Sequence, residues 1–168
     1  MSTAGTGGAR RGPRADKPAR AGKAAASAAQ IEHACARLVL QSIRAFDERD
    51  WRTYARMFTA DGVFIRANEP SQPLVGPAAI ESALATRPAN RLTMHLCTNI
   101  EIDVLDAERA EGRCYLLLYS GDAAPASGAS RPADAIQRLG EYRDRFVKTA
   151  EGWKIALRVG KLIFHAGR

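Results

Sequence analysis

Residues 91–105 constrain the fold of this chain more than any other stretch. Apolar and polar side chains alternate along this segment, RLTMHLCTNIEIDVL, with the period of a strand that has one buried face. The alternation predicts two faces. The apolar face consists of Leu92, Met94, Leu96, Thr98, Ile100, Ile102 and Val104. The polar face consists of Thr93, His95, Cys97, Asn99, Glu101 and Asp103. So long a strand predicts a curved sheet with this segment in its middle.

The basic charge of the chain is concentrated at one end. The sequence has 168 residues and a formal net charge of +7, and its first 30 residues hold six Lys or Arg side chains against one Asp. Residues 1–28 have no aromatic side chain and, after Met1, no aliphatic one larger than that of Ala, which predicts a disordered basic tail. Residues 29–168 suffice for one domain. Little of the net charge falls on this domain, so nucleic acid is not an expected partner.

The sequence lacks the motifs of membrane, secreted, metal-binding and phosphate-binding proteins, and this limits the expected cellular compartment and cofactors. Its apolar runs are too short to span a bilayer, and no apolar segment of a secretory signal is present. Cys35, Cys97 and Cys114 are odd in number and widely spaced, which is typical of reduced, mostly buried thiols in a cytoplasmic protein. No two histidines have metal-ligand spacing with a carboxylate, and no strand precedes a phosphate-binding glycine loop. We therefore expect no metal and no cofactor.

The remaining periodicity predicts three helices and further strands. Helical spacing covers residues 29–48, with Asp47 at the edge of the apolar face near the end of that helix. Asp50 is expected to cap a short second helix. The other predicted elements, in order, are the second helix at 51–58, a strand at 62–67, a loop at 68–73, a third helix at 76–87, strands at 110–120, 139–149 and 153–165, and a mobile loop at 121–138.

Three helices cannot cover both faces of such a sheet, but they can close the mouth of one that curls. The sequence therefore predicts an α+β fold, a cone-shaped curved antiparallel sheet closed by about three helices, with an apolar pocket between them. On the strand at 139–149, Tyr142 and Asp144 share a face. On the strand at 153–165, alternation places Ile155 and Arg158 on opposite faces.

Several segments also resemble a known family. These are AFDERDW at 45–51, MFTADGVFI, GPAAI at 76–80, RLTMHLCTNIEID and GEYRDRFVKTAEGWKIALR. Over about residues 30–165 the chain resembles the SnoaL-like branch of the nuclear transport factor 2-like superfamily. The resemblance implies a cone-shaped α+β fold that is usually dimeric through the outer face of the sheet. The superfamily includes polyketide cyclases, scytalone dehydratase, a bile-acid dehydratase and the small subunit of ring-hydroxylating dioxygenases.

The dehydratase pattern carries over at two positions. Scytalone dehydratase has an aspartate just before an Asp-Trp pair, where this chain has Asp47, and a histidine at the start of a long strand, which matches His95. The resemblance thus implies an Asp–His pair in a pocket. Two family residues are missing, because a tyrosine beside the aspartate is Phe46 here and no second histidine occurs at 115–118.

The residues leave two functions open. In the first, a cofactor-independent lyase or isomerase acts on a small, mostly apolar, oxygenated molecule. His95 would be its general acid and base, and Asp47 would fix the imidazole tautomer. Tyr142, Arg158 and Asn99 are candidate substrate-binding residues, although Arg158 has the alternative of pairing with Asp144 inside the sheet.

The second possible function is favoured by the missing family residues. In this case the chain is a non-catalytic ligand-binding protein or a small (beta) subunit-like partner of a ring-hydroxylating dioxygenase.

Overall fold

The computed structural model describes Met1 and residues 26–123 and 130–166. Within these ranges the elements are α1 (Ala28–Asp47), α2 (Trp51–Arg56), β1 (Phe58–Arg66), β2 (Glu69–Val75), α3 (Gly76–Ala85), β3 (Arg91–Val104), β4 (Arg109–Asp122), β5 (Gln137–Thr149) and β6 (Gly152–Ala166). The predicted basic tail lies for the most part outside the described residues. Its last residue, Ala28, already belongs to α1, which Ser27 caps.

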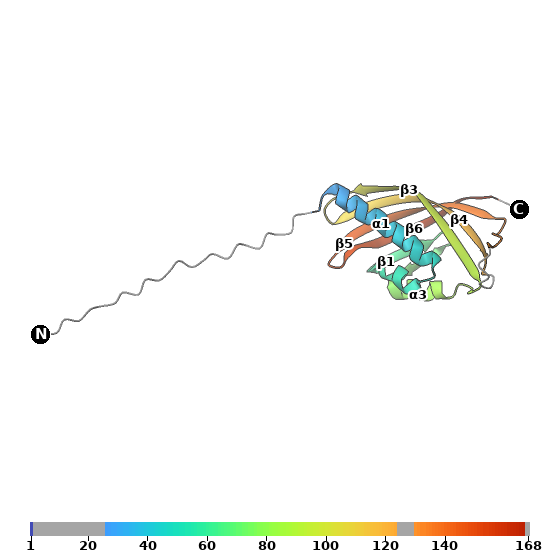
Figure 1. Ribbon diagram of the computed structural model, residues 1–168, viewed down its shortest axis with the longest axis horizontal. Coiled ribbons are helices and arrows are strands. Elements are labelled where there is room, and N and C mark those ends of the chain that lie inside the picture. The colour runs from blue at the N-terminus through green and yellow to red at the C-terminus, as the bar shows by residue number, and fades with distance from the viewer. Residues whose placement is uncertain (2–25, 124–129, 167–168) are drawn as a thin grey trace.

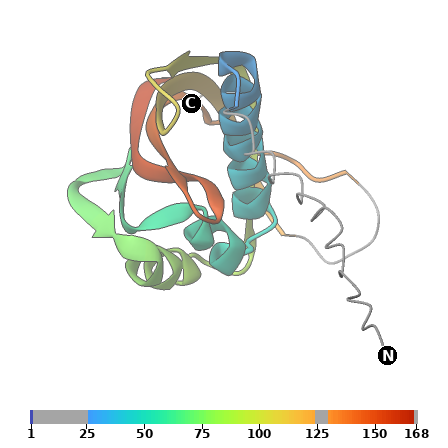
Figure 2. The same ribbon diagram turned by 90° about the vertical axis from the view of Figure 1, so that its left-hand side faces the viewer.

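The six strands form one curved, unclosed sheet in the order β2-β1-β6-β5-β4-β3. β1 and β6 pair in parallel, and the other neighbours pair antiparallel. The long strands β3 to β6 lie side by side with α1 crossing them (Figure 1). Figure 2 shows the sheet curling, with α1 along its open side and α2 and α3 together at one end. The predicted α+β architecture is confirmed.

The position predicted for residues 91–105 is wrong. β3 is an edge strand that pairs with β4 alone, not the middle of the sheet. An edge strand leaves backbone groups unpaired, and here side chains near the end of α1 bond two of them. Arg49 donates to the carbonyl of Arg91 at 3.1 Å, and the His95 N–H donates to Asp47 at 2.8 Å. These two bonds satisfy part of the free edge of β3.

The alternation of β3 also breaks, at Asn99. This residue has a φ of 52°, in the left-handed region, and the register with β4 shifts around it. A bulge exchanges the faces of a strand beyond it. His95 therefore faces the interior before the bulge, and Ile100 and Ile102 pack on the core after it. Met94 is 61% exposed, so the continuous apolar face predicted for this strand is wrong.

A second register shift, in β6, changes the expected position of Arg158. The pairing with β5 shifts between Ile155 and Leu157, so Ala156 is an extra residue on β6. Ile155 and Arg158 are consequently both fully buried, although simple alternation placed them on opposite faces.

Three element boundaries also differ from the prediction. Residues 69–73 of the predicted loop belong to β2, an edge strand that tolerates Pro70 and Pro73 because its outer N–H positions need no partner. α2 ends at Arg56, and Phe58 already begins β1. β4 and β5 both extend into the predicted loop at 121–138, of which residues 124–129 lie outside the described residues.

The core lies between the concave face of the sheet and the helices. Its centre is Tyr54 of α2, which is fully buried. The Tyr54 ring lies 5.3 Å from that of Phe46, 5.5 Å from that of Phe58 and 5.8 Å from that of Phe64, between centroids. Aromatic packing thus joins α1, α2 and β1. None of the helices in the described ranges combines the length and apolarity that crossing a bilayer requires.

Candidate active site

The end of α1 presents Asp47 to the start of β3. Asp47 is the last helical residue, and Arg49 two positions later has a φ of 61°, which turns the chain towards α2. The Arg49 guanidinium donates to the carbonyls of Arg87, Pro88 and Arg91 at 2.7, 3.0 and 3.1 Å. These bonds fix the chain entering β3 against the end of α1, which brings Asp47 beside His95.

Three donors of β3 converge on the Asp47 carboxylate. Nδ1 of His95 lies 2.6 Å from Oδ1, and the backbone N–H of the same residue donates to Oδ2 at 2.8 Å. The Thr93 hydroxyl donates to Oδ1 at 3.2 Å. Because a carboxylate only accepts, Nδ1 carries the proton and Nε2 of the neutral ring keeps its lone pair. No hydrogen bond within the described residues reaches Nε2.

The pair is nearly enclosed by the protein. The side chains of His95 and Asp47 are 8% and 12% exposed. The edge of the Phe46 ring meets the imidazole at 5.2 Å between centroids and an interplanar angle of 88°. The contact with Phe46 and the hydrogen bond from Nδ1 to Asp47 therefore fix the orientation of the imidazole.

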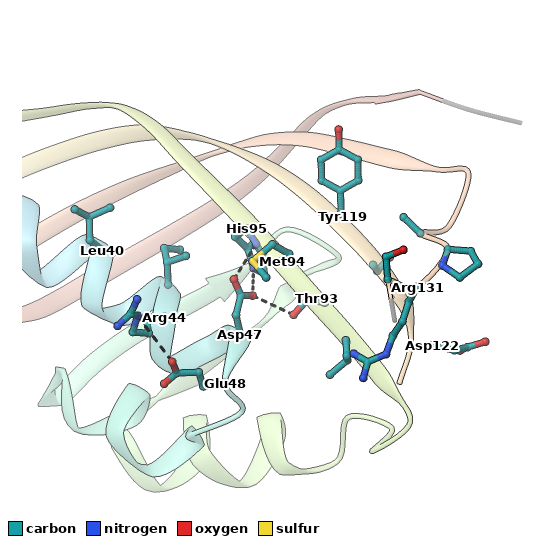
Figure 3. A pocket seen from close by; sticks show the side chains of 17 residues that line it. Leu40, Arg44, Asp47, Glu48, Thr93, Met94, His95, Tyr119, Asp122 and Arg131 are labelled. Carbon is teal, nitrogen blue, oxygen red and sulfur yellow. Dashed lines mark hydrogen bonds and ion pairs between the residues drawn. The ribbon is translucent and has the colours of Figure 1, made fainter. Parts of the chain in front are cut away.

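A cavity of about 680 Å³ borders the pair. α1, the start of β3, the end of β4 and residues 130–133 line it (Figure 3). The lining includes Leu40, Met94 and Tyr119. Arg44 and Arg131 lie on opposite sides of the Asp–His pair (Figure 3). Neither here nor elsewhere in the described ranges do three His, Cys, Asp or Glu side chains gather as metal ligands would.

Of the two alternatives for Arg158, the structure shows pairing with Asp144. The guanidinium is fully buried, and its Nε and Nη2 donate to the two oxygens of Asp144 at 2.8 and 2.7 Å. Nη1 donates to the hydroxyl of Ser42 on α1 at 2.7 Å. Burial alone would lower the pKa of Arg158, but Asp144 raises it well above its ordinary value.

The other two candidate residues also lie away from the cavity. The Arg158 guanidinium stacks 4.5 Å from the Tyr142 ring centre, and burial raises the pKa of Tyr142. Tyr142 thus belongs to the interior side of the sheet. Asn99 is exposed and accepts a hydrogen bond from Thr98 at 2.9 Å. It shapes the bulge of β3 and does not line the cavity.

Two residues of the site were missed by sequence reasoning. Thr93 lies two positions before His95 and so shares its face, a signal that was present in the sequence. Arg49 gave no such signal, because its left-handed φ and its three carbonyl acceptors depend on the tertiary fold.

Comparison with known proteins identifies the family. Residues 27–159 match the SnoaL-like domain, so this chain belongs to the SnoaL-like domain family. The resemblance read from the sequence is confirmed. No curated protein matches the sequence.

Solved structures with the same fold include several with enzyme names. A putative scytalone dehydratase from Novosphingobium aromaticivorans is 22% identical, with a TM-score of 0.65 over 81% of this chain and 86% of that one. A hexachlorocyclohexane dehydrochlorinase is 16% identical, with a TM-score of 0.67 over 82% and 88%. ActVI-ORFA from Streptomyces coelicolor is 19% identical, with a TM-score of 0.64 over 79% and 96%. At such identities the likeness concerns the fold.

Proposed function

We propose that this protein is a cofactor-independent acid–base enzyme of the lyase or isomerase class, acting on a small, mostly apolar, oxygenated molecule. The hydrogen bond of 2.6 Å between Asp47 and Nδ1 of His95 carries the proposal. It leaves Nε2 as an unprotonated nitrogen held in one orientation, beside a cavity large enough for a ring compound.

The pair suits a dehydration. Nε2 of His95 removes a proton from the carbon next to a carbonyl, and the electrons of that C–H bond form the new double bond as the β C–O bond breaks. The imidazolium returns the proton to the departing hydroxyl, which leaves as water. Asp47 stabilises the imidazolium between the two steps. Isomerisation and aldol-type ring closure would use the same first step.

Two structural neighbours support this choice of chemistry. Their names, scytalone dehydratase and hexachlorocyclohexane dehydrochlorinase, denote removal of water and of hydrogen chloride. Both eliminations need a base that takes a proton from carbon. The arrangement of Asp47 and His95 offers such a base on the same fold.

Deuterium exchange tests the proposal with simple ketones in place of the substrate. The purified protein is incubated in D₂O with a panel of cyclic β-hydroxy ketones and 1,3-diketones, and deuterium uptake beside the carbonyl is followed by mass spectrometry. We expect catalysed uptake that His95→Asn reduces by about 10²–10⁴-fold. His33→Asn is the matched control, because His33 is exposed on α1. Uptake that is absent across the panel, or equal in both variants, would contradict the proposal.

A row of apolar side chains on the outer face of the sheet supports a proposal about assembly. Leu96, Leu117, Leu139 and Phe164 are aligned cross-strand partners on β3 to β6, and the two end members are 50% and 65% exposed. We propose that this row is the interface of a cytoplasmic homodimer. Light scattering should give twice the chain mass, and Phe164→Glu should halve it. A wild-type monomer would contradict the dimer and leave this face to a different subunit.

A further inference from the structure

Residues 130–133 form one wall of the cavity that borders the Asp–His pair, and the next residue fixes this wall to the sheet. The Asp134 carboxylate accepts a hydrogen bond from the Ser120 hydroxyl at 2.8 Å and pairs with the Arg91 guanidinium. The backbone N–H of Asp134 donates to the carbonyl of Ser120 at 2.7 Å. The wall is therefore bonded both to the end of β4 and to the start of β3.

Close packing and a shared arginine also hold this wall in place. A Cβ atom at Gly121 would lie 2.9 Å from the carbonyl oxygen of Pro132, so glycine permits the close approach of the two chains. The carbonyl of Arg91, whose side chain pairs with Asp134, accepts a hydrogen bond from Arg49 at 3.1 Å. Arg91 thus joins the wall to the chain that presents the Asp–His pair.

Arg131 brings a guanidinium to this wall. Two arginines line the cavity, Arg44 and Arg131, and they lie on opposite sides of the Asp–His pair (Figure 3). Nε of Arg44 lies 3.8 Å from Oε1 of Glu48. In the part of the chain that the structure describes, no carboxylate forms an ion pair with Arg131. Arg131 is thus the arginine of the cavity that a ligand can use as a charge partner.

The carboxylates that line the cavity already have partners. Asp47 accepts hydrogen bonds from three donors of β3, and Glu48 has Arg44 beside it. Asp122 accepts a hydrogen bond from Arg91 at 2.7 Å. These three negative charges repel a doubly charged phosphate more strongly than a singly charged carboxylate, so the cavity favours a carboxylate as the anion.

We propose that Arg131 is a specificity-determining residue that binds a carboxylate of the substrate, and that Asp134 is its positioning residue. A guanidinium binds a carboxylate through paired, charge-assisted hydrogen bonds. The inference rests on the proposed function in taking His95, on the same cavity, as the reacting group. It names the substrate class, an oxygenated ring compound that carries one carboxylate.

Two probes of one shape test the charge preference. Binding of 2-naphthoate and of neutral 2-naphthamide to the full chain is measured by titration calorimetry at low salt. We expect the naphthoate to bind at least about tenfold more tightly. Arg131→Gln should abolish most of that difference and leave the affinity for the amide unchanged. Arg37→Gln, at an exposed position of α1 outside the cavity, removes the same charge and should change neither affinity.

A substitution at Asp134 separates a positioned guanidinium from general attraction by a basic protein. Asp134→Asn makes the chain more positive by one charge, yet it should lower the preference for naphthoate, because it weakens the bonds that hold the wall. Asp61→Asn, at an exposed position of β1, makes the same change of charge and should leave the preference as it is. If Asp134→Asn does not fold, Ser120→Ala removes one of the three bonds and should lower the preference less. A preference that rises or stays the same in the Asp134 or Ser120 variant would overturn the positioning role.

The outcomes also separate this inference from the proposed reaction. Equal affinity for the two probes, no binding of either, or an equal loss in Arg37→Gln would overturn the carboxylate site. His95→Asn should keep the full preference while losing deuterium exchange. A failure of the exchange test alone would therefore leave the binding site standing.

Discussion

At the scale of single residues, the Asp47 carboxylate holds the backbone of β3 and the side chain of His95 at the same time. One oxygen bonds the backbone of an edge strand, and the other bonds the imidazole and the hydroxyl of Thr93. Replacing Asp47 therefore changes both the position of β3 and the tautomer of His95. Thr93→Val removes one donor and leaves the other two, so it is the milder test of how tightly the carboxylate must be held.

The surroundings of the three thiols shift their pKa in different directions, and this gives a prediction. Burial raises the pKa of Cys35 to about 11, whereas a hydrogen bond from Cys114 lowers that of Cys97. Since the thiolate is the nucleophile, Cys97 should react at a lower pH than an ordinary thiol, and Cys35 only in strong alkali. Iodoacetamide labelling across pH 7–10, read by peptide mass spectrometry, should find Cys97 first. Cys114→Ala should slow the labelling of Cys97. Labelling of Cys35 at the same rate as Cys97 would contradict this order of pKa values.

The sequence identified some of these residues and misplaced others. Helical spacing placed Asp47 at the edge of an apolar stripe, and alternation placed His95 on the polar face of a long strand. The resemblance to scytalone dehydratase is what indicated these two residues as a pair. Arg158 and Asn99 could not be placed, because each position depends on a bulge. A bulge adds one residue to a strand because tertiary packing requires it. The alternation of apolar and polar residues in the sequence does not predict where that extra residue falls.

At the scale of elements, the bulge in β3 makes the site possible. Before it, the strand turns polar side chains to the interior, where they meet the end of α1; after it, the strand turns Ile100 and Ile102 to the core. Without the extra residue, either His95 or these apolar side chains would face outward. One strand thus supplies both site and core.

Substitutions at Asn99 test this requirement. A β-branched residue at a φ of 52° is strained, so Asn99→Val should lower the free energy of unfolding by about 1–2 kcal/mol in urea denaturation. Asn99→Gly, which adopts this φ without strain, is the control and should change it by less than about 1 kcal/mol. Equal stability of the two variants would indicate that the bulge is not fixed by the backbone at this residue.

At the scale of the whole molecule, one buried ion pair ties the layers together. Arg158 of β6 bonds Asp144 of β5 and Ser42 of α1, and all three are buried. Ser42 lies five residues before Asp47 on the same helix. The contact therefore positions α1 over the concave face and, with it, the carboxylate of Asp47.

Removing one partner of the Asp144–Arg158 ion pair should lower the free energy of unfolding more than replacing both partners with apolar residues. Asp144→Asn leaves a buried guanidinium uncompensated and should lower the free energy of unfolding by about 3–5 kcal/mol. The double variant Asp144→Leu with Arg158→Met removes both charges and should be more stable than the single one. Urea denaturation of both variants checks this. A double variant less stable than Asp144→Asn would show that Arg158 stabilises the fold through Ser42 and Tyr142 rather than through its charge partner.

The tautomer of His95 tests most directly whether Asp47 orients this ring. It is measured from the imidazole nitrogen shifts by ¹⁵N NMR, with Asp47→Asn as the comparison. We expect that the neutral ring carries its proton on Nδ1, bonded to Asp47, with Nε2 unprotonated, and that Asp47→Asn removes this preference. A proton on Nε2, or a tautomer mixture that ignores the substitution, would contradict the claim that Asp47 prepares His95 as a base.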